Sequence, residues 1–304
     1  MVEVQDWTVL PWDGSAQDYA AVAAGQVTPP EVAQWQAQGQ RVTFAHAGGV
    51  LTAHHWSAAP APGHLHKAPV VVLHGGSGSW THWLRMLGPL TQAGHAVWAL
   101  DLPGFGASDP LPHQQDADDM LPLLAASLQH WLPGQALQIM GFSLGGMTAA
   151  LLAAAYPALV RQLVLVGPPG LGLRDKPLYR LKGWRHLADP VEQLLCHQYN
   201  LAALMLADAR QIDRATLALH TANVQRDRLP RRRLASTDIL RQTLPRITCP
   251  VQAVYGQEDV LYRGLWPQVA ACFGGRLQLI AGGGHWVQYE QPGVFAEAVL
   301  PMLL

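Results

Sequence analysis

Residues 141–145 read Gly-Phe-Ser-Leu-Gly and place one serine between two glycines. The pattern Gly-x-Ser-x-Gly is typical of a sharp turn between a strand and a helix, in which close packing excludes larger side chains and the serine hydroxyl is exposed. An apolar run precedes these residues, and a stretch rich in alanine and leucine follows them. We therefore interpret Ser143 as a nucleophile that attacks a carbonyl carbon.

A serine hydroxyl becomes a useful nucleophile only when a base removes its proton and a third group orients that base. With this serine motif, the partners follow in the order acid, then histidine. His285 is the only histidine after His220, and Asp259 follows an apolar run that ends at Gly256. The sequence predicts His285 as the base and Asp259 as its orienting acid, with Glu258 as the alternative acid.

The attack on a carbonyl also needs N–H groups that stabilise the developing oxyanion. One donor is expected from the backbone of Leu144, at the start of the helix after Ser143. The other is expected from the glycine-rich stretch at 74–78, where the backbone can approach a ligand closely. Gly76 is the preferred donor there and Ser77 the alternative.

Several aromatic residues lie next to these motifs in the sequence: Trp80, Trp83, Phe142 and Trp286. They favour an apolar substrate pocket, to which we assign Trp80, Phe142 and Trp286. For any single one of them, an ordinary place in the core is the alternative.

Short apolar runs alternate with helical patterns from residue 69 onward, and most runs end in turn residues. Such runs, apolar throughout, predict a mostly parallel sheet with helices on both faces, an α/β fold. Open sheets of this class bind ligands beyond the carboxyl ends of their strands, where the motifs above fall. The expected strands are 70–73, 96–100, 137–140, 163–166, 251–255 and 276–280, and the expected helices are 80–93, 118–131, 144–156 and 294–300.

The alternation stops at 169–245, which reads mostly helical over 191–199, 201–208 and 213–224. The chain is therefore divided into an N-terminal extension (1–40), a core in two parts (41–168 and 246–304) and a helical insertion (169–245). In the extension, Thr28 is expected to cap a helix over 30–38. A hairpin of strands 41–47 and 50–56, turning at Gly48-Gly49, is expected next.

Composition excludes several classes of protein. Of the 304 residues, 13% are charged and 49% hydrophobic, and the formal net charge is −1. That balance argues against nucleic acid and anionic membranes as partners. The three cysteines are widely spaced without a Cys-x-x-Cys pair, which fits a reducing compartment, so we expect a cytoplasmic protein. No metal or other cofactor is expected, and the basic run at 226–233 is interpreted as a solvated face.

The motifs LHGGSGSW, DLPGFGASD, GFSLGG, YGQEDV and GGGHWVQYEQP, in this order over about residues 40–304, resemble those of the α/β-hydrolase superfamily. The resemblance implies that 169–245 is a helical cap over the active site. It also implies a serine hydrolase that acts through an acyl-enzyme. The expected partner is a small-molecule substrate, and the oligomeric state is left open, with a homodimer as one option.

The stretch HWVQYE also resembles the hydrolases that cleave carbon–carbon bonds in ring-fission products of aromatic compounds. That resemblance implies a cap arginine that binds the substrate carboxylate. Ungapped matching of 208–224 places His220 at that position, with Arg210 and Arg214 out of register, and His220 is assigned to the pocket. We therefore prefer an ester substrate, with carbon–carbon hydrolysis and non-catalytic ligand binding as alternatives.

Overall fold

The computed structural model describes residues 8–59, 67–174, 176–229 and 231–304. Its centre is one eight-stranded sheet in the order β1-β2-β4-β3-β5-β6-β7-β8. The strands are β1 (Gln40–His46), β2 (Gly49–Trp56), β3 (Val70–Leu73), β4 (Val97–Asp101), β5 (Leu137–Phe142), β6 (Val160–Val166), β7 (Val251–Gly256) and β8 (Leu277–Ile280).

The sheet is parallel except at one edge. β1 and β2 form an antiparallel hairpin, and β2 pairs antiparallel with β4. All other neighbours, from β4 through β8, are parallel. The prediction of a mostly parallel α/β sheet is therefore confirmed. Since β3 lies beside β5, the loops that follow these two strands emerge next to each other.

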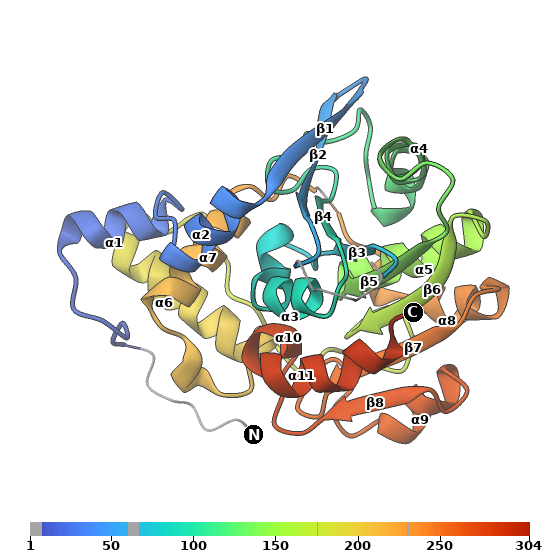
Figure 1. Cartoon of the computed structure of the whole chain (residues 1–304). Coiled ribbons are helices and arrows are strands. Elements are labelled where there is room, and N and C mark those ends of the chain that lie inside the picture. The colour runs from blue at the N-terminus through green and yellow to red at the C-terminus, as the bar shows by residue number, and fades with distance from the viewer. Residues whose placement is uncertain (1–7, 60–66, 175, 230) are drawn as a thin grey trace.

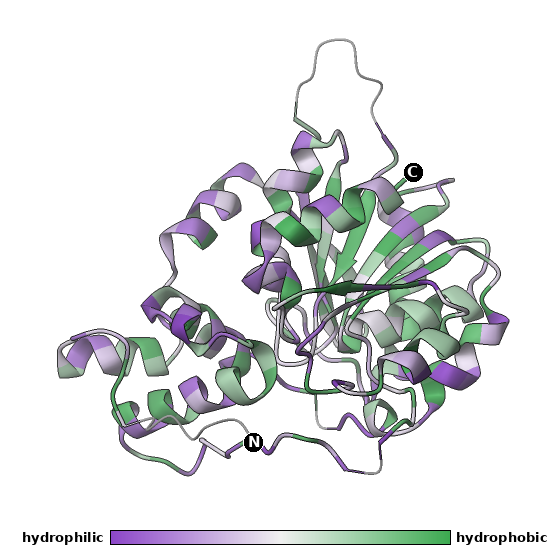
Figure 2. Cartoon of the chain, turned by 90° about the horizontal axis from the view of Figure 1, so that it is seen from below, coloured by the Kyte–Doolittle hydropathy of each residue, from purple (hydrophilic) through white to green (hydrophobic). Residues whose placement is uncertain are grey.

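Both faces of the sheet are buried, which explains why its strands are apolar throughout. Along β3, Val71 and Leu73 pack into one hydrophobic cluster, whereas Val70 and Val72 pack into the cluster on the opposite face. Figure 2 shows the hydrophobic strands enclosed by helices of mixed character. Alternate residues of a strand point to opposite faces, so a strand covered on both sides needs no polar positions.

Helices cover each face. One face packs α4 (Leu121–Trp131), α5 (Leu144–Ala155), α8 (Ile239–Thr243) and α9 (Trp266–Cys272). The other packs α2 (Pro30–Gln38), η1 (Trp80–Met86), α3 (Leu87–Gln92), α10 (Val287–Glu290) and α11 (Pro292–Val299). Short 3-10 turns complete the core: η2 (Ala117–Met120), η6 (Leu244–Arg246) and η7 (Leu300–Met302).

The chain between β6 and β7 leaves the sheet and forms the cap segment (residues 169–245). It contains α6 (Pro190–Asn200), η3 (Leu201–Met205), η4 (Ala209–Gln211), α7 (Arg214–Gln225) and η5 (Leu234–Ser236), and it ends on α8 in the core layer. Figure 1 shows α6 and α7 to one side of the sheet, with α1 (Ala16–Ala23) beside them. Asp18 of α1 pairs with Arg214 of α7 at 2.5 Å, so the N-terminal extension packs on the cap segment.

Several local expectations need correction. Pro29, not Thr28, is the N-cap residue of α2, and no side chain forms a capping hydrogen bond at the start of this helix. The hairpin turns at Ala47-Gly48, because Gly49 already pairs with His46. The helices expected at 80–93 and 118–131 begin as 3-10 turns, and residues 201–205 form a π-helical turn, so the helix expected over 201–208 is shorter.

Within the described part of the chain, no helix combines the length and the apolar character that a membrane span needs.

Candidate active site

Ser143 occupies the tight turn between β5 and α5, with backbone angles of φ +50° and ψ −116°. A Cβ added to Gly141 would lie 2.4 Å from the carbonyl oxygen of Gly145, and one added to Gly145 would lie 2.4 Å from that of His74. Any other residue at either glycine would force the backbones apart. The two glycines therefore allow the strained turn that raises Ser143 above the end of the sheet.

Ser143, His285 and Asp259 form a continuous chain of hydrogen bonds. His285 Nε2 lies 2.9 Å from Ser143 Oγ, and His285 Nδ1 lies 2.8 Å from Asp259 Oδ2. Asp259 is fully buried and also accepts the N–H of Leu261 at 2.9 Å. A carboxylate can only accept here, so the ring carries its proton on Nδ1, and Nε2 can accept the proton of Ser143.

Glu258, the alternative acid, points elsewhere and pairs with Arg263 at 3.3 Å. Behind the hydrogen-bonded chain lies Gly167, which follows β6 with φ +56°. A Cβ on Gly167 would be 3.2 Å from both Asp259 Oδ2 and His285 Nδ1. Glycine at this position therefore leaves room for the pair.

The loop after β3 runs directly beside Ser143. A Cβ on Gly75 would lie 3.1 Å from the Cβ of Ser143. The Gly75 N–H donates to His82 Nδ1 at 3.2 Å, and the Gly75 carbonyl oxygen accepts from His74 Nδ1 at 2.7 Å. These bonds fix the loop without using the N–H of Gly76.

Neither of the two N–H groups expected to stabilise an oxyanion is engaged by the described residues. The N–H of Leu144 lies in the first turn of α5, and that of Gly76 lies in the loop beside Ser143. Both therefore remain available to a developing negative charge.

The segment that follows α7 (residues 226–229 and 231–233), called the strap below, contacts the loop after β3. The Ser77 hydroxyl donates to Asp227 at 2.5 Å, and Ser77 has φ +51°. Arg232 pairs with the same Asp227 carboxylate, and its side chain lies 3.4 Å from the position of a Cβ on Gly76. The interpretation of the whole basic run as a solvated face is therefore wrong for Arg232.

The loop that carries His285 is tied to the cap segment. Glu290, which is 4% exposed, accepts the N–H of Gly284 at 2.6 Å through one oxygen and that of Asp208 at 2.7 Å through the other. The N–H of Trp286 donates to the carbonyl of Met205 at 2.7 Å. Glu290 is the last residue of the HWVQYE stretch, but its spacing alone did not indicate this role.

A cavity of about 430 Å³ opens beside the loop after β3 and extends beneath the cap segment. His220, assigned to the substrate pocket from the sequence, lines this cavity, and His82 and His197 line it too. The remaining lining residues are Gly76, Ser77, Leu181, Lys182, Gly183, Trp184, Arg185, His186, Asn200, Leu204, Met205 and Val224.

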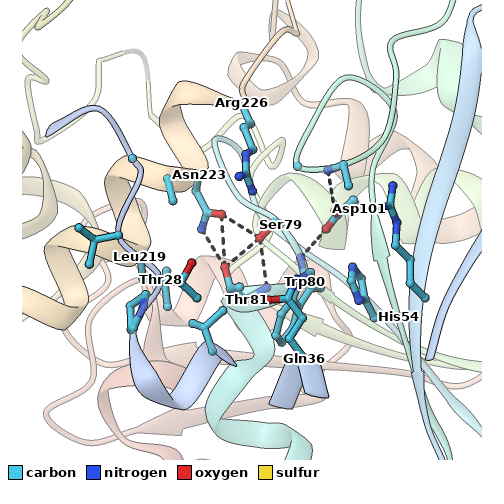
Figure 3. Close-up of a pocket in the computed structure, with 18 residues that line it drawn as sticks. Thr28, Gln36, His54, Ser79, Trp80, Thr81, Asp101, Leu219, Asn223 and Arg226 are labelled. Atoms are coloured by element: carbon cyan, nitrogen blue, oxygen red, sulfur yellow. Dashed lines mark hydrogen bonds between the residues drawn. The ribbon is translucent and has the colours of Figure 1, made fainter. Parts of the chain in front are cut away.

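The assignment of three aromatic residues to this pocket is not supported. Phe142 and Trp286 are buried behind the site: Phe142 packs against the rings of His82 and His285, and the indole N–H of Trp286 donates to the carbonyl of His82 at 2.9 Å. Trp80 lines a different cavity of about 150 Å³, next to His54 (Figure 3). Phe142 and Trp286 thus support the site from the core and do not line the cavity beside Gly76.

The two arginines that the matching placed out of register, Arg210 and Arg214, lie away from the cavity. Arg210 is exposed and pairs with Asp208 at 2.8 Å, and Arg214 pairs with Asp18 of the N-terminal extension. Neither lines the cavity beside Gly76.

Burial shifts the pKa values of several titratable side chains near the site. It lowers the pKa of His82 well below its usual value, with a further contribution from His74. It also lowers the pKa of His74 to about 4. The carboxyl of Asp101, which accepts the N–H of Trp80 at 2.7 Å, has its pKa raised by burial to about 6. In the described residues, no group of three or more His, Cys, Asp and Glu side chains could hold a metal ion.

Comparison with known proteins supports the fold and a family. A family model described as "alpha/beta hydrolase fold" matches residues 68–191. A 2-hydroxy-6-oxo-6-phenylhexa-2,4-dienoate hydrolase of Comamonas testosteroni is 28% identical over 253 residues, which cover 77% of this chain and 87% of that protein.

Solved structures of the same fold include enzymes with different names. The carboxylesterase CesB of Bacillus subtilis has a TM-score of 0.68 at 16% identity, covering 94% of this chain and 96% of that one. The Cif epoxide hydrolase of Acinetobacter nosocomialis has a TM-score of 0.71 at 17% identity, and the match covers 99% of this chain and 100% of that one. The matched model, the relative and the solved structures agree with the motifs of the sequence: the chain has the α/β-hydrolase fold and resembles the proteins of that superfamily.

Proposed function

We propose that this protein is a serine hydrolase that cleaves small, largely apolar carboxylic esters. The observation that carries the proposal is the hydrogen-bonded chain from Ser143 Oγ through His285 to the buried carboxylate of Asp259. A serine, a base and an orienting acid in this geometry are the parts that nucleophilic acyl transfer requires.

In this proposal, His285 Nε2 takes the proton of Ser143 while Oγ attacks the ester carbonyl. The oxyanion receives hydrogen bonds from the N–H groups of Leu144 and Gly76. His285 then gives its proton to the leaving alcohol, and an acyl-enzyme on Ser143 remains. Water, deprotonated by His285, attacks the acyl carbonyl; the bond to Ser143 Oγ breaks, His285 returns the proton to Oγ, and the acid leaves. Asp259 stabilises the imidazolium ion in both halves of the reaction.

Carbon–carbon hydrolysis is the second candidate, and the relative from Comamonas testosteroni favours it. Against it stands the cap segment, in which His220 occupies the matched position and Arg210 and Arg214 are engaged elsewhere. The cap cations that do line the cavity, Lys182 and Arg185, are exposed residues. An ester substrate requires only the catalytic groups and the cavity, so it agrees with these residues without a further binding group.

The deciding experiment compares initial rates on p-nitrophenyl esters of increasing acyl length with rates on 2-hydroxy-6-oxo-6-phenylhexa-2,4-dienoate. The proposal predicts a higher kcat/KM for the best ester, and loss of that activity in Ser143→Ala by roughly four to six orders of magnitude. A higher kcat/KM for the dienoate would overturn the ester proposal. Equal background rates in both proteins on every compound would favour a binding protein.

A further inference from the structure

Four histidines line the cavity beneath the cap segment: His186 is exposed, and the other three come from three different elements. His82 comes from η1 in the core, His197 from α6 and His220 from α7. The rings of His197 and His220 lie 5.2 Å apart, and His197 also packs against Trp184 at 4.9 Å. Figure 1 shows α6 and α7 side by side, and the two rings from these helices form one patch of the cavity wall.

His197 is 1% exposed, and neither of its ring nitrogens has a hydrogen-bond partner among the described residues. A buried polar group without a partner is costly, and such groups in native proteins call for a specific explanation. His82 differs, because its Nδ1 accepts the N–H of Gly75. The unused nitrogens of His197 therefore point to a group that enters the cavity.

Both cap histidines are neutral near pH 7. Burial lowers the pKa of His197 to about 4, with a further contribution from the Arg185 guanidinium, and it lowers the pKa of His220 to about 3, with a contribution from His197. A neutral imidazole offers one N–H donor and one acceptor nitrogen. The cations that line the cavity, Lys182 and Arg185, belong to exposed residues at its rim.

We infer that His197 and His220 form a subsite for an uncharged hydroxyl group of the substrate, such as a phenol or an alcohol. The hydroxyl donates to the acceptor nitrogen of one ring and accepts the N–H of the other. A carboxylate only accepts, so it pairs neither of the two acceptor nitrogens, whereas a hydroxyl pairs one of them; the carboxylate is therefore disfavoured. This inference rests on the proposed function in one respect, namely that the cavity beside Gly76 receives the substrate of Ser143.

Binding to the Ser143→Ala protein tests the subsite without turnover. The probes are 4-propylphenol, its methyl ether 4-propylanisole, which cannot donate, and 4-propylbenzoate, which carries a charge. Calorimetry at pH 7.5 should show the phenol binding about three- to tenfold tighter than the ether, the range expected for one net hydrogen bond. The benzoate should bind more weakly than the phenol.

Two substitutions in the same background remove the nitrogens and keep the ring shape: His197→Phe and His220→Phe. Loss of the ring that accepts the hydroxyl proton should bring the ratio of phenol to ether affinity to about one, whereas loss of the ring that donates its N–H should weaken the binding of both probes. His130→Phe, at an exposed histidine of α4, is the matched control and should keep the ratio. Because the His197 nitrogens are unpaired without ligand, His197→Phe should also leave Tm unchanged or raise it.

Tighter binding of the benzoate, no binding of any probe, or a phenol preference that survives both substitutions would overturn the subsite. So would a lower Tm in His197→Phe with the preference unchanged, because His197 would then be structural. Ester hydrolysis by the native protein is measured separately. If the native protein hydrolyses no ester but the phenol preference is observed, the proposed function is refuted and the subsite stands. If the native protein hydrolyses esters but the preference is absent, the subsite is refuted and the proposed function stands.

Discussion

The hydroxyl of Ser77 donates to the carboxylate of Asp227 at 2.5 Å, across 150 positions of the sequence. This bond joins the loop beside Ser143 to the strap that leads out of the cap segment. Ser77 has φ +51°, a backbone conformation that is costly for a residue with a side chain. Because Asp227 holds Ser77, it also holds the adjacent Gly76, whose N–H is proposed to bind the oxyanion.

Asp227→Ala should therefore lower kcat for ester hydrolysis by about ten- to a hundredfold, less than or comparable to the loss of one oxyanion donor. KM should change by about twofold or less, since the lining residues other than Gly76 and Ser77 stay in place. Steady-state kinetics on one p-nitrophenyl ester measures both values. The matched control is Asp238→Ala, which breaks an exposed pair with Arg241 at 2.7 Å in the cap segment. Equal kinetics in both variants would contradict a positioning role for Asp227.

Asp259→Asn should leave the fold intact and lower kcat by about 10⁴-fold. An amide can donate its N–H₂ to Nδ1, which then carries no proton, so the ring adopts the wrong tautomer for accepting the proton of Ser143. Glu258→Gln is the control, because Glu258 is half-exposed and pairs with Arg263. If Glu258→Gln lost the activity and Asp259→Asn kept it, the assignment of the acid would be reversed.

The hydrogen-bonded chain of Ser143, His285 and Asp259 could be predicted from the sequence because each residue follows an apolar strand of a mostly parallel sheet. Ser143 follows β5, Asp259 follows β7 and His285 follows β8. The carboxyl ends of parallel strands meet at one edge, so residues far apart in sequence fall close together. The helical insertion could be predicted because the alternation of apolar strands and helices stops at its start.

The walls of the cavity could not be predicted in this way. Phe142 and Trp286 adjoin catalytic residues in sequence, but alternate positions in a turn or strand point to opposite sides, and both rings face the core. His82, His197 and Arg232 reach the cavity or its loop from a 3-10 turn, a cap helix and a strap. Their positions depend on how the cap segment packs, which no local pattern encodes.

Gly167 offers a test of the space around the catalytic pair. Gly167→Ala forces a side chain onto a backbone with φ +56° and places its Cβ 3.2 Å from Asp259 and His285. We expect a loss of about 1 kcal/mol in unfolding free energy, together with a lower kcat. Gly264→Ala has the same backbone penalty at φ +84° but meets nothing within 4 Å. Gly264→Ala should lose a similar amount of unfolding free energy, measured by urea unfolding, and keep the kcat of the native protein. Equal kcat values in the two variants would contradict the close contact of position 167 with Asp259 and His285.

The buried histidines predict acid sensitivity. The folded-state pKa values of His54, His74, His197 and His220 lie at about 4, 4, 4 and 3, below the usual 6.5. The unfolded chain therefore takes up protons first as the pH falls. Stability is full above pH 6.5 and is lost toward pH 4, by up to about 3 kcal/mol for each histidine.

Asp101 acts in the opposite sense, because its pKa of about 6 lies above the usual 3.8 and the folded state takes up its proton first. Four histidines outweigh one carboxyl, so the net trend is a loss of stability in acid. Urea unfolding at pH 7.5, 6 and 5 measures it. His197→Phe should flatten the decline, and His130→Phe should not. The prediction would be contradicted if the unfolding free energy of the native protein increased as the pH fell from 6.5 to 4.

The central claim is that Ser143 is the nucleophile, activated by His285. The most direct test treats the protein with a fluorophosphonate and locates the adduct by peptide mass spectrometry. The account predicts one adduct on Ser143, no adduct in Ser143→Ala and labelling slowed by at least about a thousandfold in His285→Ala. An adduct on another residue, or ester hydrolysis that persists undiminished in Ser143→Ala, would contradict it.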